Sequence, residues 1–421
     1  MLRSIMRLFC VAVLAAGTAL AQEAGPSDLL KTADEMIQVT ARLRGLEPKA
    51  PITRGVKSRV EIAQYLNEQV QKNFSQGELE LEGKMLKTIG LIPAAMDYRD
   101  FVLKLYTEQI GGFYDPEKKT FFIASWLSAA DQKPIMVHEL GHALQDQYFD
   151  VKKILEESRK LDNDDKALAR QALMEGDGMV VMLNYLLEPA KRNFSQLPDL
   201  AFIMRTQMSS MQSQYEVFKS APPYVQEMIL FPYGYGAAFL QKVWMQNPSW
   251  ETVNKIYSDL PASTEQIIHA EKYYGTRDEP EAVSAESLAS KLGADWKVTY
   301  KNVLGEFGLN LVLAMHVSEE RAKRSAAGWD GDQVLLLENA AGKNAVLIDT
   351  VWDSTAEADE FFSALQVWFQ QKFPTGTRSE ETSAGFKVTQ DKEIHALRQD
   401  GIRVRFIIGL PESDASKLAG F

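Results

Sequence analysis

The sequence predicts an α+β protein: a mostly helical first part with a small β-hairpin, followed by a smaller part that mixes strands with one helix. The first part is indicated by apolar residues that recur at spacings of three and four from Ser27 to about Tyr274, the pattern of helices packed on a core. The second is indicated by short strand-like runs between turn residues from Gln333 onward. A chain of 421 residues, 45% of them hydrophobic, is long enough for two domains.

The helices of the first part follow from periodicity and end signals. Ser27 can cap the first helix, Asp164 or Asp165 a later long one, and Ser263 with Gln266 forms a capping box for the last. The predicted helices are residues 27–43, 58–74, 97–110, 135–147, 164–188, 232–246 and 262–274.

One segment of the first part is not helical. In "GGFYDPEKKTFFIAS", residues 111–125, two aromatic-rich runs flank "DPEKK". This arrangement predicts a β-hairpin directly before the helix at 135–147.

The second part begins after a charged, proline-containing stretch at residues 275–287, where we expect a domain boundary. The dipeptide Asp400-Gly401 is a strong hairpin signal. A predicted amphipathic helix spans residues 354–373. The predicted strands are residues 333–339, 344–352, 385–390, 393–399 and 402–409. We therefore expect domains at 22–275 and 288–421, the second a small α+β domain.

The first 21 residues are typical of a signal peptide. Arg3 and Arg7 precede an apolar run too short to span a bilayer comfortably, and residues 19–21, "ALA", fit a cleavage site. We expect the mature chain to begin at Gln22 and to be exported, to a periplasm or out of the cell; an uncleaved anchor helix is the alternative. Cys10, the single cysteine, lies in this segment, so the mature chain would lack disulfides. No later run is apolar enough for membrane insertion.

The stretch "IMVHELGHALQDQ", residues 135–147, carries two histidines four residues apart. On a helix, His138 and His142 lie on one face and can both point a ring nitrogen at one ion. Glu139 lies one residue round and can reach a water bound to that ion. Zinc suits imidazole ligands, and a catalytic zinc takes three protein ligands. The alternative is a pair of hydrogen-bonded core histidines.

The third ligand must come from a later segment. Gln145 and Tyr148 replace the glycine and third histidine of a metzincin, so that class is excluded. Glu175 in "ALMEGDG", 33 residues after His142, is the best candidate because its neighbours are apolar. Asp177 could support a ligand histidine or cap the chain locally. The weaker rivals are Asp146, Glu156, Glu157, Glu188 and His269.

Two glycines flank Asp177. Gly176 and Gly178 each cost about 1 kcal/mol against alanine inside a helix. Their presence indicates close packing by another segment, and Gly141 in the histidine helix allows the same.

The segment 108–147, followed by "EGDG" and "STEQIIHAEKY", resembles the gluzincin branch of zincin-like metallopeptidases, in particular a little-characterised group of exported bacterial proteins. The resemblance covers about the central half of the chain. It implies that His138, His142 and Glu175 bind Zn²⁺ and that Glu139 is the general base. Gly178 stands where such enzymes often have alanine, a small change. The strand in "KTFFIAS" would be an edge strand that pairs with extended substrate.

We therefore expect a zinc-dependent peptidase acting on peptide or protein substrates. His269 is a candidate donor to the tetrahedral oxyanion, through a pair with Glu265, as are Tyr233 and Tyr235; a surface ion pair and core packing are the plainer interpretations. Two alternatives stay open: a catalytically silent protein-binding module, or a zinc hydrolase of a non-peptide amide. The net charge of −11 argues against nucleic acid as a partner.

Overall fold

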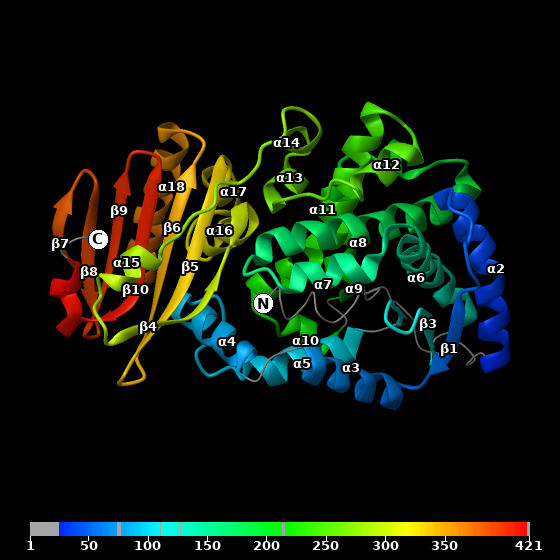
Figure 1. Ribbon diagram of the computed structural model, residues 1–421, viewed down its shortest axis with the longest axis horizontal. Helices are drawn as coiled ribbons and strands as arrows, with labels where there is room; N and C mark the ends of the chain where they lie inside the picture. The colour runs from blue at the N-terminus through cyan, green and yellow to red at the C-terminus, as the bar shows by residue number, and fades with distance from the viewer. Residues whose placement is uncertain (1–24, 74–76, 110, 127, 213–214, 419–421) are drawn as a thin grey trace.

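The computed structural model describes residues 25–73, 77–109, 111–126, 128–212 and 215–418. The predicted signal peptide, residues 1–21 with Cys10, lies outside them. The fold is α+β, as predicted: a helical half and a seven-stranded antiparallel sheet occupy opposite ends of an elongated molecule (Figure 1). No helix in the described part of the chain is long and apolar enough to cross a membrane.

Each helix predicted for the first half is present, although the bounds of some differ. The helices predicted at 135–147 and 232–246 begin six and nine residues earlier, and the one at 262–274 is divided in two. The helices at 78–89, 151–159, 200–212, 216–219 and 250–256 were not predicted. The helices are α2 (Pro26–Arg44), α3 (Arg59–Asn73), α4 (Glu78–Ile89), α5 (Tyr98–Gln109), α6 (Ala129–Phe149), α7 (Val151–Arg159), α8 (Asp164–Leu187), α9 (Leu200–Gln212), α10 (Glu216–Lys219), α11 (Pro223–Gln246), α12 (Trp250–Ile256), α13 (Thr264–Ile268) and α14 (Glu271–Tyr274), with 3₁₀ turns η1 (Glu188–Ala190) and η2 (Phe194–Gln196).

Two of the three predicted caps are wrong by one or two residues. Gly25 is the N-cap of α2, so Ser27 lies in the first turn behind a proline, which suits that position. The side chain of Asn163, rather than either predicted aspartate, caps α8. Ser263 caps α13 as predicted, accepting a hydrogen bond from the backbone N–H of Gln266 at 3.2 Å.

A three-stranded sheet stands beside α6, in the order β1-β3-β2. Its strands are β1 (Thr53–Lys57), β2 (Gly112–Asp115) and β3 (Thr120–Ala124). The predicted hairpin is confirmed, with Tyr114 opposite Phe121. The prediction that "KTFFIAS" forms an edge strand is wrong, because β1 pairs with β3 in parallel on its other side. The free edges belong to β1 and β2.

Glycines bring the central helices into backbone contact, as their positions predicted. A Cβ on Gly236 of α11 would lie 1.9 Å from the carbonyl oxygen of Ala172, and one on Gly176 would meet Gly236 itself. Between α6 and α8, a Cβ on Gly141 would be 3.8 Å from the Cα of Gly178. These contacts set α8 between α6 and α11, at the centre of the helical half.

The second half is a sheet with strand order β4-β5-β6-β10-β9-β8-β7. Five strands and the long helix were predicted, whereas the two edge strands were missed. The edge strand β7, "TRSEET", is exposed along its whole length, so it has no apolar alternation to reveal it. The strands are β4 (Trp296–Asn302), β5 (Trp329–Asn339), β6 (Asn344–Trp352), β7 (Thr377–Thr382), β8 (Gly385–Gln390), β9 (Glu393–Asp400) and β10 (Arg403–Pro411). The helices are α15 (Glu286–Ser290), α16 (Gly305–Ala314), α17 (Glu319–Ala326) and α18 (Thr355–Lys372), with a 3₁₀ segment η3 (Glu412–Leu418).

The two halves share the largest apolar cluster of the molecule. The largest cluster of buried apolar residues contains members of both halves, and α4 of the first half packs against the sheet (Figure 1). Lys372 Nζ donates to the carbonyl oxygen of Ile89 at the end of α4, at 2.8 Å. The stretch 275–287 therefore separates two kinds of secondary structure without separating two cores.

Candidate metal centre

Three side chains converge where α6 crosses α8. His138 and His142 lie one turn apart on α6, and their Nε2 atoms are 3.0 Å apart. A carboxylate oxygen of Glu175, on α8, lies 3.1 Å from His138 Nε2 and 3.3 Å from His142 Nε2. All three side chains have no exposed surface. The structure thus brings together the three residues that the sequence analysis selected from distant segments.

The donor set fits a metal ion. Zinc ligands lie about 2.0–2.2 Å from the ion, so tetrahedral ligands are roughly 3.3–3.5 Å from one another. The three separations between the donor atoms, 3.0, 3.1 and 3.3 Å, are close to that spacing. Nitrogen and carboxylate oxygen donors are also the types zinc accepts. His138, Glu139 and His142 form a group whose ligand atoms all lie within 4.8 Å of one another.

The protonation states of Glu175 and His138 suit the binding of a cation. Burial raises the pKa of the Glu175 carboxyl, but the two neighbouring histidines outweigh it and hold that pKa at about 2. Burial lowers the pKa of His138, and its contact with Glu175 offsets this only in part. An ionised Glu175 carboxylate beside a His138 imidazole that resists protonation suits the binding of a cation.

Glu139 is held by the small sheet. Its carboxylate accepts a hydrogen bond from the backbone N–H of Tyr114 on β2, at 2.8 Å, and is fully buried. The hairpin therefore fixes the carboxylate beside the two histidines. A backbone donor of this kind leaves no mark in the side-chain pattern, so the sequence analysis missed Tyr114.

The ring of His138 lies against Gly178. A Cβ built on Gly178 would be 2.7 Å from His138 Cε1 and 2.8 Å from Nδ1, closer than real Cβ contacts. The change from alanine to glycine, which the resemblance presents as small, therefore has a steric consequence for the His138 ring in this chain. The absence of a side chain at Gly178 leaves room for the ring of His138, a candidate ligand.

Asp177 fills neither of its two predicted roles. It binds Arg44 of α2 through two hydrogen bonds, of 2.6 and 3.0 Å, and neither side chain is exposed. Tyr257 adds a third, donating its hydroxyl at 2.8 Å. The Arg44 guanidinium also lies 4.5 Å from the ring of Trp250. This buried ion pair joins α2 to α8, the helix that carries Glu175.

His269 lies at the C-terminal end of α13 and faces the sheet half. Its Nε2 is 3.0 Å from a carboxylate oxygen of Glu306 on α16, and this hydrogen bond raises the pKa of His269. The expected partner Glu265 instead accepts from Lys272 at 2.6 Å. The structure places Glu175, and not His269, with the two histidines; no contact among the described residues tests the expected catalytic role of His269.

The two candidate tyrosines differ in position. Tyr233 of α11 is buried, and its ring centroid is 6.2 Å from that of His138. Tyr235 stacks on Phe231 at 4.8 Å and lines a cavity of about 190 Å³ beside α16. Of these two tyrosines, Tyr233 is the one whose ring adjoins the candidate ligand His138.

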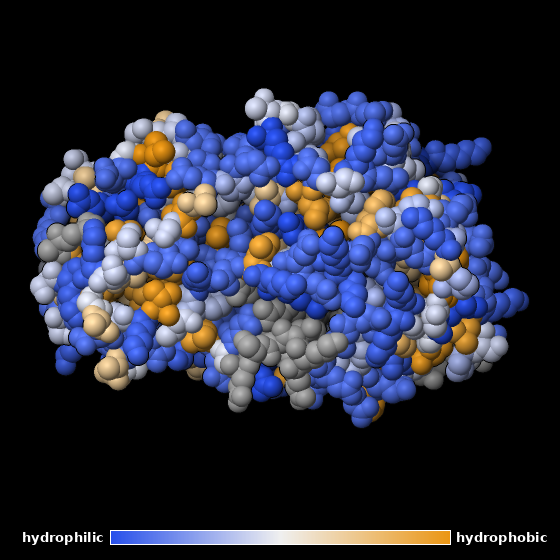
Figure 2. Space-filling model, in the orientation of Figure 1, coloured by the Kyte–Doolittle hydropathy of each residue, from blue (hydrophilic) through white to orange (hydrophobic). Residues whose placement is uncertain are grey.

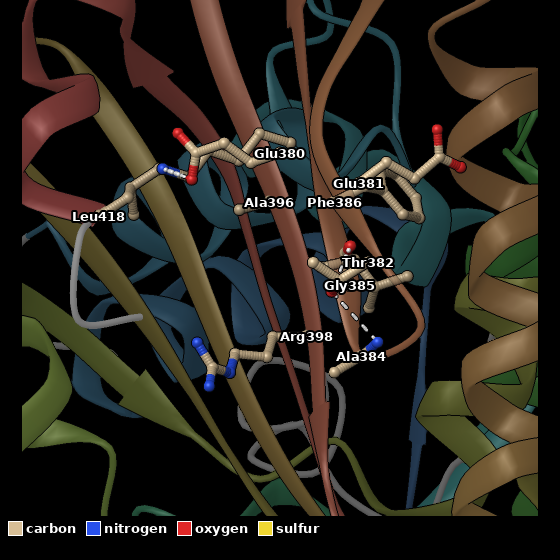
Figure 3. A pocket seen from close by; sticks show the side chains of 11 residues that line it. Glu380, Glu381, Thr382, Ala384, Gly385, Phe386, Ala396, Arg398 and Leu418 are labelled. Carbon is tan, nitrogen blue, oxygen red and sulfur yellow. Dashed lines mark hydrogen bonds and ion pairs between the residues drawn. The ribbon is translucent and has the colours of Figure 1, made fainter.

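A larger cavity, of about 380 Å³, lies at the seven-stranded sheet and is lined by residues near the C-terminal end of the chain. Its walls come from β7, β8, β9 and Leu418, with Glu380 and Glu381 pointing to opposite sides of their strand (Figure 3). Lys387 Nζ pairs with Glu380 at 2.7 Å. The face of the molecule in Figure 2 is mostly hydrophilic, with apolar residues in small separate patches. Neither feature brings acid–base or ligand groups together as the α6–α8 crossing does.

Comparison with known proteins adds little about function. A family model described as a domain of unknown function (DUF8575) matches residues 297–419, the sheet half. Among solved structures, the chain is similar to one from Chloroflexus aurantiacus that is provisionally described as a hydrolase with a novel fold. The two share 16% identity with a TM-score of 0.39, over 66% of this chain and 98% of that chain. No curated protein matches.

Proposed function

We propose that the protein is a zinc-dependent peptidase of the gluzincin type, exported to a periplasm or out of the cell. The observation that carries this proposal is the convergence of His138, His142 and Glu175 with Glu139 beside them. Three protein ligands leave one tetrahedral position for water, the arrangement of a catalytic rather than a structural zinc.

Different residues of the centre would bind the metal and transfer the proton. His138, His142 and Glu175 would hold the ion, which when bound lowers the pKa of water and polarises a carbonyl. Glu139 accepts the proton of the attacking water and passes it to the leaving amine, a role that general base catalysis assigns to a positioned carboxylate. The N–H of Tyr114 keeps that carboxylate in place.

The developing oxyanion needs a further donor, and we assign it to Tyr233. Its ring adjoins His138, whereas His269 is engaged with Glu306. Removing one oxyanion donor costs about 10²–10³-fold in kcat in enzymes of this kind of chemistry. Tyr233→Phe should therefore keep the metal and lose roughly that factor, while His269→Gln should leave kcat nearly unchanged.

The decisive experiment pairs metal content with hydrolysis. Glu139→Gln retains all three ligands, so the purified chain should hold about one zinc and lose about 10²–10⁴-fold in turnover of a casein digest or peptide library. Glu156→Gln, at an exposed position on α7, is the matched control and should match the wild type. Unchanged turnover in Glu139→Gln would remove the mechanism.

A second candidate is a metal-holding module that does not turn over substrate, with the zincin-like helices kept for binding a protein. Full burial of His138, Glu139, His142 and Glu175 favours it, because a peptidase must admit its substrate to these groups. The same experiment separates the two. Stoichiometric zinc without hydrolysis by the wild type would support the module.

A further inference from the structure

The side chain of Gln145 connects the two helices that carry the candidate ligands. It lies on α6, three residues after His142, and is 1% exposed. Its Oε1 is 3.0 Å from His142 Nδ1. Its Nε2 donates to the carbonyl oxygen of Met174 on α8, at 3.1 Å. Met174 directly precedes Glu175. The Gln145 amide therefore contacts both the His142 ring on α6 and the backbone of α8 next to Glu175.

The hydrogen-bond directions follow from chemistry alone. A carbonyl oxygen can only accept, so the Gln145 atom that faces Met174 must be the NH₂ group. The atom that faces His142 is then the amide oxygen, which can also only accept. His142 Nδ1 must therefore carry the proton. In a neutral imidazole this leaves the lone pair on Nε2, the atom that points at His138 and Glu175.

We infer that Gln145 is the positioning residue of the metal centre: it fixes the tautomer and rotation of His142 and ties that ring to the helix of Glu175. The inference rests on the proposed metal function. Groups that bind the far nitrogen of a ligand histidine typically contribute 10–100-fold to metal affinity. Burial sharpens the effect, because no water replaces a lost partner at a site without exposed surface.

The test measures metal binding by the metal-free chain. Gln145→Met has a similar size and loses both hydrogen bonds. Gln145→Glu keeps an acceptor for His142 and, when ionised, loses the donor to Met174. Gln147→Met is the matched control, because Gln147 also bridges α6 to another segment: its Oε1 accepts from the N–H of Lys49 at 2.7 Å, and its Nε2 donates to Ala50 at 3.0 Å.

Two measurements distinguish a role of Gln145 in positioning the His142 ring from a role in stabilising the fold alone. Cobalt(II) titration followed by visible absorption, with zinc in competition, gives the affinity; urea unfolding of the metal-free chain gives the stability. We expect affinity to fall about 10–100-fold in Gln145→Met, and to stay within about threefold of the wild type in Gln145→Glu, although both variants lose stability. Gln147→Met should bind as the wild type does.

Two results would overturn the inference alone: a wild type that binds cobalt and a Gln145→Met variant that binds it equally well, or equal losses of affinity in the Met and Glu variants. A wild type that binds neither metal would instead overturn the proposed function, and the inference with it. Loss of affinity in Gln145→Met, with recovery in Gln145→Glu, supports the assignment.

Discussion

Breaking the buried pair of Arg44 and Asp177 should destabilise the protein far more than breaking an exposed pair on the same helix. Arg44→Met removes a guanidinium that makes two hydrogen bonds to Asp177, at 2.6 and 3.0 Å. The carboxylate is left without exposure, with the Tyr257 hydroxyl as its remaining donor among these groups. Loss of one partner from a buried pair costs about 3–5 kcal/mol, against a total stability of about 5–15 kcal/mol.

The control is Arg42→Met. Arg42 pairs with Glu188 at 2.6 Å, but these side chains are 56% and 47% exposed. Exposed pairs contribute about 0–1 kcal/mol, so this variant should unfold almost as the wild type does. Both pairs join α2 to the end or middle of α8, which makes burial the main difference between them.

Urea unfolding followed by circular dichroism measures both variants at one pH and salt concentration. Arg44→Lys, which keeps the charge and loses the two-pronged geometry, should lie between Arg44→Met and the wild type. The double variant Arg44→Met/Asp177→Leu should recover most of the loss, because no buried charge remains unpaired. Equal, small losses of stability in Arg44→Met and Arg42→Met would show that burial does not strengthen the Arg44–Asp177 pair.

Two further predictions concern Gly178, which lies against the His138 ring, and the buried carboxyl of Asp165. Gly178→Ala should displace the His138 ring, since the new Cβ would lie 2.7 Å from Cε1. We expect at least a tenfold loss of zinc affinity, measured by competition with a chelator, and a loss of about 1–3 kcal/mol in the free energy of unfolding because of overpacking. Gly141→Ala, whose Cβ would meet its neighbour at an ordinary 3.8 Å, is the control and should bind zinc normally; equal affinities in both variants would contradict the account of Gly178. Burial raises the pKa of Asp165 to about 8, with Asp332 and Glu306 adding to the shift. Because this folded pKa exceeds the ordinary value of about 4, the folded state holds the proton longer, and the contribution to stability is complete below about pH 4 and is lost as the pH rises to about 8. Asp165→Asn should flatten the fall of thermal stability over that interval, and an unchanged slope would show that Asp165 is not its source.

Several features followed from the sequence alone because their signals are local. A spacing of four puts His138 and His142 on one helix face whatever the rest of the chain does. Gly176 and Gly178 predicted close packing, because glycine destabilises a helix and the local sequence offers no other explanation for two of them. The inner strands β5, β6 and β10 were found because strands covered on both faces are long apolar runs. The strand β7 and the helix α4 were missed, the first because it is exposed throughout and the second because its glutamates and lysines interrupt the apolar pattern.

The partners of side chains that lie far apart in the sequence depend on the tertiary structure. No spacing in the sequence shows that Asp177 turns to Arg44, 133 residues earlier, rather than to a ligand histidine. Nor does it show that Gln145 reaches Met174, that His269 meets Glu306, or that β1 covers the expected edge of β3. Such pairings depend on how the helices cross. The crossing is the combined result of many contacts throughout the core, such as that between Gly176 and Gly236. The residues that could form a metal centre can be identified from their spacing and their neighbours in the chain. The groups that hold those residues in position follow from the packing of α2, α6, α8 and the hairpin, because buried polar groups take the partner that the fold brings within hydrogen-bond distance.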